Sequence, residues 1–296
     1  MQVREGMMPF KGYQTYYRIV GEKKEGRAPL LLLHGGPGST HNYMELLDPL
    51  GEEREVISYD QLGCGNSYVE GHPELWKKET WQEELLALID HLGLKEFHLL
   101  GQSWGGMLAI STLIDRKLTG VCSLILSSTL SSASLWAFEQ HRMIKEMSER
   151  DQKAIAYAET HNDYDCPPYR EANERYMEKH CASAPKDSDP ECLRRKKRSG
   201  TESYITAWGP NEYTPNGTLK DYEYTDRLGE IGVPSLIISG SEDLCTPLIA
   251  RTMEEGIPDA RWELFEGCRH MCFAEDTPRY LALLMEWLER HDPSRV

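Results

Sequence analysis

The segment Gly101–Gly106 contains a serine whose surroundings suit nucleophilic chemistry. It reads Gly-Gln-Ser-Trp-Gly-Gly and places Ser103 at the centre of a Gly-x-Ser-x-Gly pattern. The apolar run Phe97–Leu100 before it predicts a strand, and Met107–Ile110 after it predicts the first turns of a helix. A serine on a sharp turn between a strand and a helix presents its hydroxyl to solvent on a strained backbone. We therefore predict that Ser103 is a nucleophile; the alternative is a serine in an ordinary turn.

A serine nucleophile needs a general base and an acid that orients it. In a chain with this strand-turn-helix pattern they are expected downstream, in the order acid and then histidine. The run Leu236–Gly240 predicts a strand that delivers Asp243 to a sheet edge where ligands bind, with Glu242 as the weaker candidate. The strand at Trp262–Phe265 is followed by His270, which alone among ten histidines combines this order with a loop position. We predict Asp243 as the orienting acid, rather than only a turn cap, and His270 as the base.

Two further loops follow predicted strands. His34–Gly38 follows the run Leu30–Leu33, and its glycines allow backbone N–H groups to approach a ligand closely. We predict that the N–H groups of Gly36 and Trp104 stabilise an oxyanion; the alternative for this loop is a tight turn without a role. The loop Asp60–Ser67 lies at the same sheet edge, and it lacks the lysine and the glycine spacing of a phosphate-binding loop.

Strands and helices alternate along much of the chain. This alternation predicts an α/β fold with a mostly parallel central sheet, helices on both of its faces and an inserted helical lid. An antiparallel hairpin is expected at the start, formed by the segment Tyr13–Val20 and the residues before it. The remaining predicted strands are Leu30–Leu33, Glu55–Tyr59, Phe97–Leu100, Val121–Leu126, Ser235–Ser239 and Arg261–Phe265.

Two helices carry clear terminal signals. Thr80–Glu83 has the pattern of a capping box, and Gly93 is placed to end the helix that it opens. Thr277 and Pro278 open the last helix. The residues expected to face the core are Leu85, Leu86, Leu88, Ile89 and Leu92 in the first helix, and Leu281, Leu284, Met285 and Leu288 in the last.

The alternation of strand and helix stops near Ser131 and resumes near Arg227. We predict a helical cap at residues 131–227, and a hydrolytic core at 1–130 and 228–296. Within the cap, Leu135–Ser148 and Pro168–Tyr176 have helical patterns. The basic run Arg194–Arg198 is interpreted as a solvated helix face, with a site for an anionic partner as the alternative.

Composition restricts the function classes. Lys and Arg total 33 and Asp and Glu total 48, giving a net charge of −15 that disfavours binding to nucleic acid or to anionic membranes. The first residues lack the apolar region of a secretory signal, and the eight cysteines show no disulfide framework, so we expect free thiols and a cytoplasmic protein. Cys268–Cys272 could suggest a metal site, but no second cluster completes one, so no metal is expected. A monomer is favoured.

Taken together, these motifs resemble the α/β-hydrolase superfamily and, within it, the prolyl iminopeptidases. The resemblance rests on His34–Gly38, on Asp60–Ser67 and on Gly101–Gly106, and it extends over most of the chain. Trp208–Tyr213 resembles the segment in which that family carries a glutamate that binds the free α-amino group of the substrate. Glu212 takes that place here, with a surface glutamate as the alternative. Many family members have a second glutamate directly after the triad aspartate; Leu244 stands there instead.

The resemblance implies a serine aminopeptidase that releases an N-terminal residue, with proline preferred or tolerated, through an acyl-enzyme. The expected substrate is a short peptide or aminoacyl compound with a free N-terminus, and no cofactor is implied. Because Leu244 replaces the second glutamate, an amino-acid amidase or a carboxylesterase on the same triad remains the alternative. The aromatic residues Trp208, Tyr204 and Tyr213 are predicted to line the substrate pocket, or else to form the core of the lid.

Overall fold

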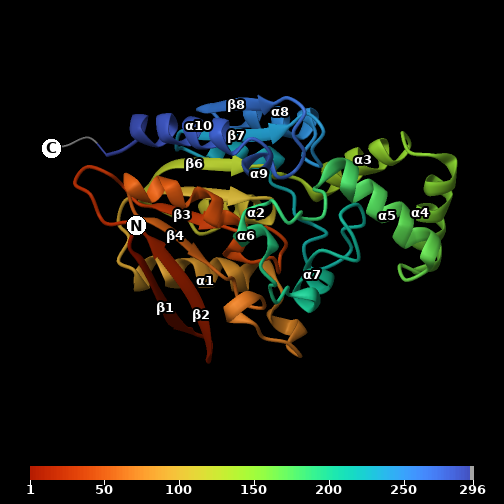
Figure 1. The fold of residues 1–296 in the computed structure, drawn as a ribbon, viewed down its shortest axis with the longest axis horizontal. Coiled ribbons are helices and arrows are strands. Elements are labelled where there is room, and N and C mark those ends of the chain that lie inside the picture. Colours follow the sequence, from red (N-terminus) through yellow and green to blue (C-terminus); the bar gives the residue numbers. More distant parts are fainter. Residues whose placement is uncertain (294–296) are drawn as a thin grey trace.

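A single eight-stranded sheet organises the protein (Figure 1). The computed structural model describes residues 1–293. The strands lie in the order β1-β2-β4-β3-β5-β6-β7-β8. The β1–β2 and β2–β4 pairs are antiparallel and the others are parallel. Their bounds are β1 Val3–Phe10, β2 Tyr13–Val20, β3 Leu30–Leu33, β4 Val56–Tyr59, β5 Phe97–Gln102, β6 Val121–Ser127, β7 Ser235–Gly240 and β8 Ala260–Phe265. The predicted hairpin and all six later strands are confirmed.

Side chains alternate between two apolar layers, one on each face of the sheet. Leu31 and Leu33 of β3 point into the layer that contains α1 (Lys78–His91), α2 (Trp104–Asp115) and α8 (Pro247–Gly256). Leu30 and Leu32 point into the opposite layer, with the 3-10 helix η1 (His41–Glu52), α9 (Cys272–Glu275) and α10 (Thr277–Arg290). Both faces of the parallel strands are therefore covered, which explains why their sequences are apolar without alternation. The predicted fold class is confirmed.

A helical insert interrupts the sheet between β6 and β7. Its helices are α3 (Ala133–Ile144), α4 (Glu149–His161), α5 (Pro167–His180), α6 (Glu191–Arg194) and α7 (Thr201–Ala207). Figure 1 shows α3, α4 and α5 projecting from the edge at which β6 and β8 end. The chain then returns through residues 208–224 and the 3-10 helix η4 (Thr225–Glu230) to β7. We call the segment from α3 to residue 224 the insert. The division into domains at residues 131 and 227 stays a prediction.

The two ends of the insert are hydrogen-bonded to each other. The N–H of Ala133 donates to the carbonyl of Tyr222 at 2.8 Å, and the N–H of Tyr224 donates to the carbonyl of Ser131 at 2.7 Å. Ser132 and Glu223 form an isolated antiparallel bridge between these bonds. The insert therefore leaves and re-enters the core through one closed neck.

Two details predicted for α1 and α10 are wrong. Helix α1 begins at Lys78, so Thr80 lies inside its first turn and caps nothing; the extended residue before the helix is Lys77. Packing of the buried Trp76 against Trp81 sets this start and overrides the local capping pattern. In α10, Met285 is 51% exposed, and Trp287 takes its expected place in the core.

The predicted helix Leu135–Ser148 is two elements. Helix α3 ends at Ile144, and Ser148 instead caps α4 by accepting the N–H of Asp151 at 3.2 Å. The predicted helix Pro168–Tyr176 is confirmed and extends over Pro167–His180.

Within residues 1–293, no helix combines the length and the apolar character that crossing a membrane requires. All eight cysteines are free, as predicted. The cytoplasmic location and the monomeric state stay predictions.

Candidate active site

Ser103 occupies a strained turn between β5 and α2. Its backbone has φ 54° and ψ −123°, a left-handed conformation that a residue with a side chain rarely adopts. The Ser103 N–H donates to the carbonyl of Ser127 at the end of β6, at 2.9 Å, and Thr129 Oγ1 donates to the Ser103 carbonyl at 2.6 Å. The strain is thus held in place by bonds to the neighbouring strand and the loop after it.

The glycines around Ser103 are required by close packing. A Cβ on Gly101 would lie 2.3 Å from the carbonyl oxygen of Gly105, and a Cβ on Gly105 would lie 2.0 Å from that of Leu33. A Cβ on Gly106 would meet the side chain of Thr129 at 2.4 Å. The Gly-x-Ser-x-Gly pattern therefore reflects a turn that presses against β3, as the sequence predicts.

Asp243 and His270 form a buried pair. Asp243 follows β7 and His270 lies in the loop after β8, and Nδ1 of His270 lies 2.7 Å from Oδ1 of Asp243. The same carboxylate accepts the N–H groups of Cys245 at 2.8 Å and Gly240 at 3.2 Å, which fixes its orientation. Because a carboxylate accepts, Nδ1 is the protonated ring nitrogen, and Nε2 keeps the free lone pair that a general base needs.

The environment of His270 favours its charged form. Burial alone lowers the pKa of an imidazole, but the charge of Asp243 and its hydrogen bond outweigh that effect. The carboxylate of Glu212 adds to the same effect, so the pKa of His270 lies above its usual value of 6.5. The imidazolium form of His270 is therefore stabilised at this position.

Gln102 connects the serine turn to the histidine loop. Its Nε2 lies 3.5 Å from the carbonyl oxygen of His270, and its Oε1 accepts the hydroxyl of Tyr43 at 2.8 Å. Among the described residues there is no hydrogen bond from Ser103 Oγ to the imidazole. The structure thus brings Ser103, Asp243 and His270 to one edge of the sheet, with the serine–histidine bond open. Such bonds often tighten only when substrate binds.

Two backbone N–H groups lie free beside Ser103. In residues 1–293, neither Gly36 nor Trp104 donates its N–H to a protein acceptor. Gly36 has φ 116°, and a Cβ on the preceding Gly35 would lie 3.1 Å from Cβ of Ser103, so the glycine-rich loop passes directly over the serine. Trp104 begins α2, where the first N–H groups lack helical acceptors. Both predicted donors therefore border the serine.

Glu212 lies in the insert and is connected to His270 through Trp136. Its Oε1 accepts the hydroxyl of Tyr204 at 2.7 Å, and its backbone carbonyl accepts Nε1 of Trp136 at 2.8 Å. The Trp136 ring packs edge-on against the ring of His270, with centroids 6.1 Å apart. Burial raises the pKa of Glu212, while the Tyr204 bond and the charge of His270 act against that rise. A partly dehydrated carboxylate thus lies near the base.

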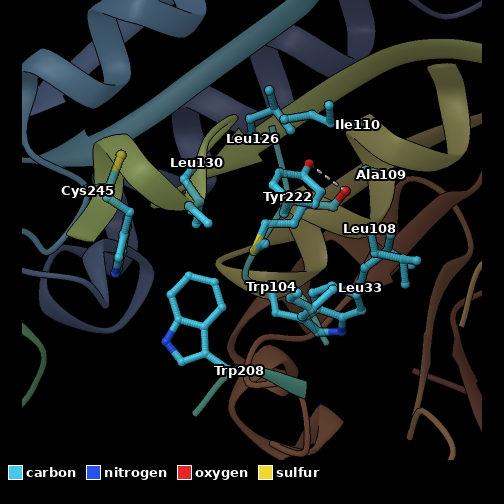
Figure 2. Close-up of a cluster of buried hydrophobic side chains, with 14 of the residues drawn as sticks. Leu33, Trp104, Leu108, Ala109, Ile110, Leu126, Leu130, Trp208, Tyr222 and Cys245 are labelled. Carbon is cyan, nitrogen blue, oxygen red and sulfur yellow. Dashed lines mark hydrogen bonds between the residues drawn. The ribbon is translucent and has the colours of Figure 1, made fainter. Parts of the chain in front are cut away.

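The three aromatic residues of the predicted pocket occupy different places. Trp208 is buried in the same apolar cluster as Trp104 and Leu130 (Figure 2). Nε1 of Trp208 is buried and has no partner among the described residues. The Tyr204 hydroxyl points to Glu212. Tyr213, in contrast, lies inside the insert, with its hydroxyl bonded to Asn173, which favours the lid-core alternative for this residue.

Sequence reasoning missed several residues of this region. Trp136 links His270 to Glu212, and Tyr43 accepts the N–H of Gly35 at 2.6 Å. His180 of α5 packs behind the Asp243 loop, with Nδ1 2.9 Å from the carbonyl oxygen of Glu242. No local motif marks these residues, because each reaches the site through packing of η1 or the insert on the core.

The fold and the site define a class. The chain has an α/β-hydrolase fold, and a family model described as alpha/beta hydrolase fold matches residues 28–277. Over 293 residues it is 59% identical to the proline iminopeptidase of Clostridioides difficile (strain 630), covering 99% of this chain and 100% of that protein. It is 58% identical over 295 residues to the proline iminopeptidase of Lactobacillus helveticus (strain DPC 4571), covering 99% and 100%. The chain belongs to the proline iminopeptidase family.

Solved structures agree with this assignment. The crystal structure of proline iminopeptidase from Mycobacterium smegmatis superimposes with a TM-score of 0.85 at 29% identity, covering 98% of this chain and 99% of that one. The crystal structure of VinJ superimposes with a TM-score of 0.88 at 30% identity, covering 97% and 99%. The similarity thus extends through both the core and the insert.

Proposed function

We propose that this protein is a serine aminopeptidase that releases N-terminal proline from short peptides. The observation that carries the proposal is the position of Glu212 in the insert, where Tyr204 bonds its carboxylate and its backbone carbonyl accepts Nε1 of Trp136, the ring that packs against His270. Full-length similarity to proline iminopeptidases supports the choice of substrate.

In the proposed reaction, Ser103 Oγ attacks the carbonyl carbon of the first peptide bond and gives its proton to Nε2 of His270. Asp243 holds the ring in the tautomer that this step needs. The N–H groups of Gly36 and Trp104 donate hydrogen bonds that stabilise the negative charge on the former carbonyl oxygen. His270 then protonates the leaving amine, and a water molecule hydrolyses the acyl-enzyme.

Glu212 supplies selectivity for a free N-terminus. A carboxylate removed from water gains by pairing with an ammonium group, and it stays unpaired when the amine is acylated. Leu244 stands where the resemblance leads one to expect a second carboxylate; it is fully buried, and its carbonyl accepts Nε2 of Gln140. Position 244 therefore supplies no second carboxylate, and Glu212 is the residue proposed to bind the amine.

The proposal is tested by comparing prolyl arylamide with N-acetylprolyl arylamide. Wild type should cleave the free-amine substrate much faster. Because a hydrogen bond to a charged group contributes about 1.5–3 kcal/mol, Glu212→Gln should lower kcat/KM for that substrate by about 10- to 100-fold. The same variant should change the slow cleavage of the acetylated compound by less than about threefold.

Glu242→Gln is the matched control. Glu242 is exposed and lies next to Asp243, so its substitution should leave the ratio between the two substrates unchanged. Equal cleavage of free and acetylated substrates by wild type would contradict the aminopeptidase and favour a carboxylesterase or a general amidase.

A further inference from the structure

Gln61 contacts both loops that carry the predicted oxyanion donors. Its Nε2 donates to the carbonyl of His34 at 3.0 Å, directly before Gly35 and Gly36. Its Oε1 accepts Nε1 of Trp104 at 2.7 Å. The side-chain amide therefore uses its donor on one loop and its acceptor on the other. Gln61 is 1% exposed, so water does not compete for these bonds.

The backbone of Gln61 makes a third bond to the same loop. Its N–H donates to Nε2 of His34 at 3.0 Å, while Nδ1 of His34 lies 2.8 Å from the carbonyl oxygen of Gly35. A carbonyl only accepts and an N–H only donates, so these partners require the neutral ring with its proton on Nδ1. Burial lowers the pKa of His34 to about 4, which keeps the ring in this form at neutral pH.

The loop that carries Gln61 is itself held rigidly. The N–H of Leu62 donates to the Glu84 carboxylate at 2.9 Å. The carbonyl of Leu62 accepts Nε1 of Trp81 at 3.1 Å. Asp60 accepts the backbone N–H groups of His41 at 2.9 Å and Asn66 at 2.8 Å. The residues on both sides of Gln61 are thus fixed. Its side chain can therefore hold the His34–Gly38 loop and Trp104 at a fixed separation.

We propose that Gln61 is a positioning residue that sets the separation of the Gly36 and Trp104 N–H groups in the oxyanion hole. The proposal rests on the proposed function, since it assumes that these two groups bind the oxyanion. A residue with this role acts on the transition state more than on bound substrate, because only the transition state carries the full negative charge.

Three side chains near Gln61, those of His34, Asp60 and Cys64, lie close enough together to suit a metal ion. Ligand atoms of His34, Asp60 and Cys64 lie within 4.8 Å of one another. However, the free ring nitrogen of His34 already accepts the Gln61 N–H, and Asp60 Oδ1 lies 2.8 Å from Nδ1 of His41. These hydrogen bonds satisfy the atoms without an ion, which supports the positioning role.

The test measures Gln61→Leu with a substrate, with prolinal and with proline. Prolinal forms a tetrahedral adduct with an active serine and places an oxyanion in the hole, whereas proline binds without that charge. We expect kcat to fall by about 10- to 100-fold with KM within about threefold of wild type. The inhibition constant of prolinal should rise by a similar factor, and that of proline should change less than about threefold.

Two further variants keep the test decisive. Gln82→Leu is the matched control, because Gln82 is equally buried and bonds Arg116 and Asp115 away from the site, so its kinetic ratios should equal those of wild type. If Gln61→Leu does not fold, Trp104→Phe removes the indole donor to Gln61 together with part of the buried ring, and it keeps the backbone N–H. It should lower kcat in the same direction, by about 3- to 10-fold.

Equal weakening of prolinal and proline in Gln61→Leu, or an unchanged kcat in either site variant, overturns the positioning role. Failure of the proposed function gives a different result: wild type itself would then cleave the free and the acetylated substrates equally, or Ser103 would not react with a fluorophosphonate.

Discussion

Asp243 controls the protonation of His270 through one 2.7 Å hydrogen bond, and this has a measurable consequence. The base must be neutral, so kcat/KM should be lost as pH falls through the pKa of His270, which is raised above 6.5. In Asp243→Asn the lowering effect of burial remains and the raising effect of the charge is removed. The acid limb of a pH–rate profile should therefore move to lower pH in the variant.

Glu212→Gln provides an internal comparison for this profile. The Glu212 charge also raises the pKa of His270, but it acts less strongly than Asp243. Its removal should move the acid limb in the same direction by a smaller amount. A limb that stays in place in Asp243→Asn would show that another group limits the rate at low pH.

Ser103→Ala should separate chemistry from stability. Ser103 has no hydrogen bond from its hydroxyl to the His270 ring, and alanine would occupy φ 54° at a similar cost. We expect kcat to fall at least about 100-fold and the melting temperature to stay unchanged. Ser111→Ala in the following helix α2 is the control, because among the described residues the Ser111 hydroxyl bonds only the Leu108 carbonyl, and it should keep full activity. Residual activity of Ser103→Ala above a hundredth of wild type would contradict the nucleophile.

At the scale of residues, the sequence predicts those site residues that belong to a local motif. The turn at Ser103 and the loops that carry Asp243 and His270 follow strands whose apolar runs are easy to recognise. The interactions of Gln61 could not be derived in this way, because its partners, His34 and Trp104, lie on two other loops. Their proximity depends on the strand order, in which β3 lies between β4 and β5.

Among the elements, the contact between α2 and β3 leaves no room for a larger side chain at Gly105. A Cβ on Gly105 would lie 2.0 Å from the backbone oxygen of Leu33, which cannot move without disrupting the sheet. Gly105→Ala should therefore lower the free energy of unfolding by about 1–3 kcal/mol, as measured by urea denaturation. Gly232→Ala is the control, since no atom lies within 4 Å of its added Cβ. Equal stability of the two variants would contradict the close approach.

Helix boundaries were harder to predict than strands, for a physical reason. Thr80–Glu83 has a capping pattern, but burial of Trp76 and Trp81 sets where α1 begins. Likewise, Ser148 was expected at the end of one helix and instead begins the next. A capping residue contributes about 1 kcal/mol, whereas a buried tryptophan contributes more, so tertiary packing decides the boundary.

At the scale of the whole molecule, Asp292 ties the C-terminal segment to the starts of β3, β4 and β5. Its carboxylate pairs with Arg54 at 2.7 Å and Arg27 at 3.0 Å, and it lies 3.2 Å from Nε2 of His98. Asp292→Asn would leave the buried Arg54 without its counter-ion, so we expect a loss of about 3 kcal/mol in unfolding free energy. Glu289→Gln, which removes an exposed partner of Arg27, should cost less than about 1 kcal/mol.

Acid titration should report the same contact. Burial raises the pKa of Asp292, but the hydrogen bonds to His98, Arg54 and Arg27 outweigh it. The pKa of Asp292 therefore lies well below its usual value. A carboxylate with a lowered pKa stabilises the fold above its unfolded pKa and loses that contribution as pH falls. Wild type should therefore lose stability below about pH 4 more steeply than Asp292→Asn. Parallel curves for the two proteins would contradict a stabilising role.

Because the insert joins the core through the closed neck at residues 131–133 and 222–224, it can be exchanged for another segment by protein engineering. Because both ends of the excursion meet at one paired point, a foreign segment with the same end-to-end spacing could replace it without stretching the sheet. Glu212 would leave with the exchanged segment, whereas Ser103, Asp243 and His270 would remain. Chimeras joined at the neck should therefore differ in substrate preference and keep the three residues proposed to cleave the bond.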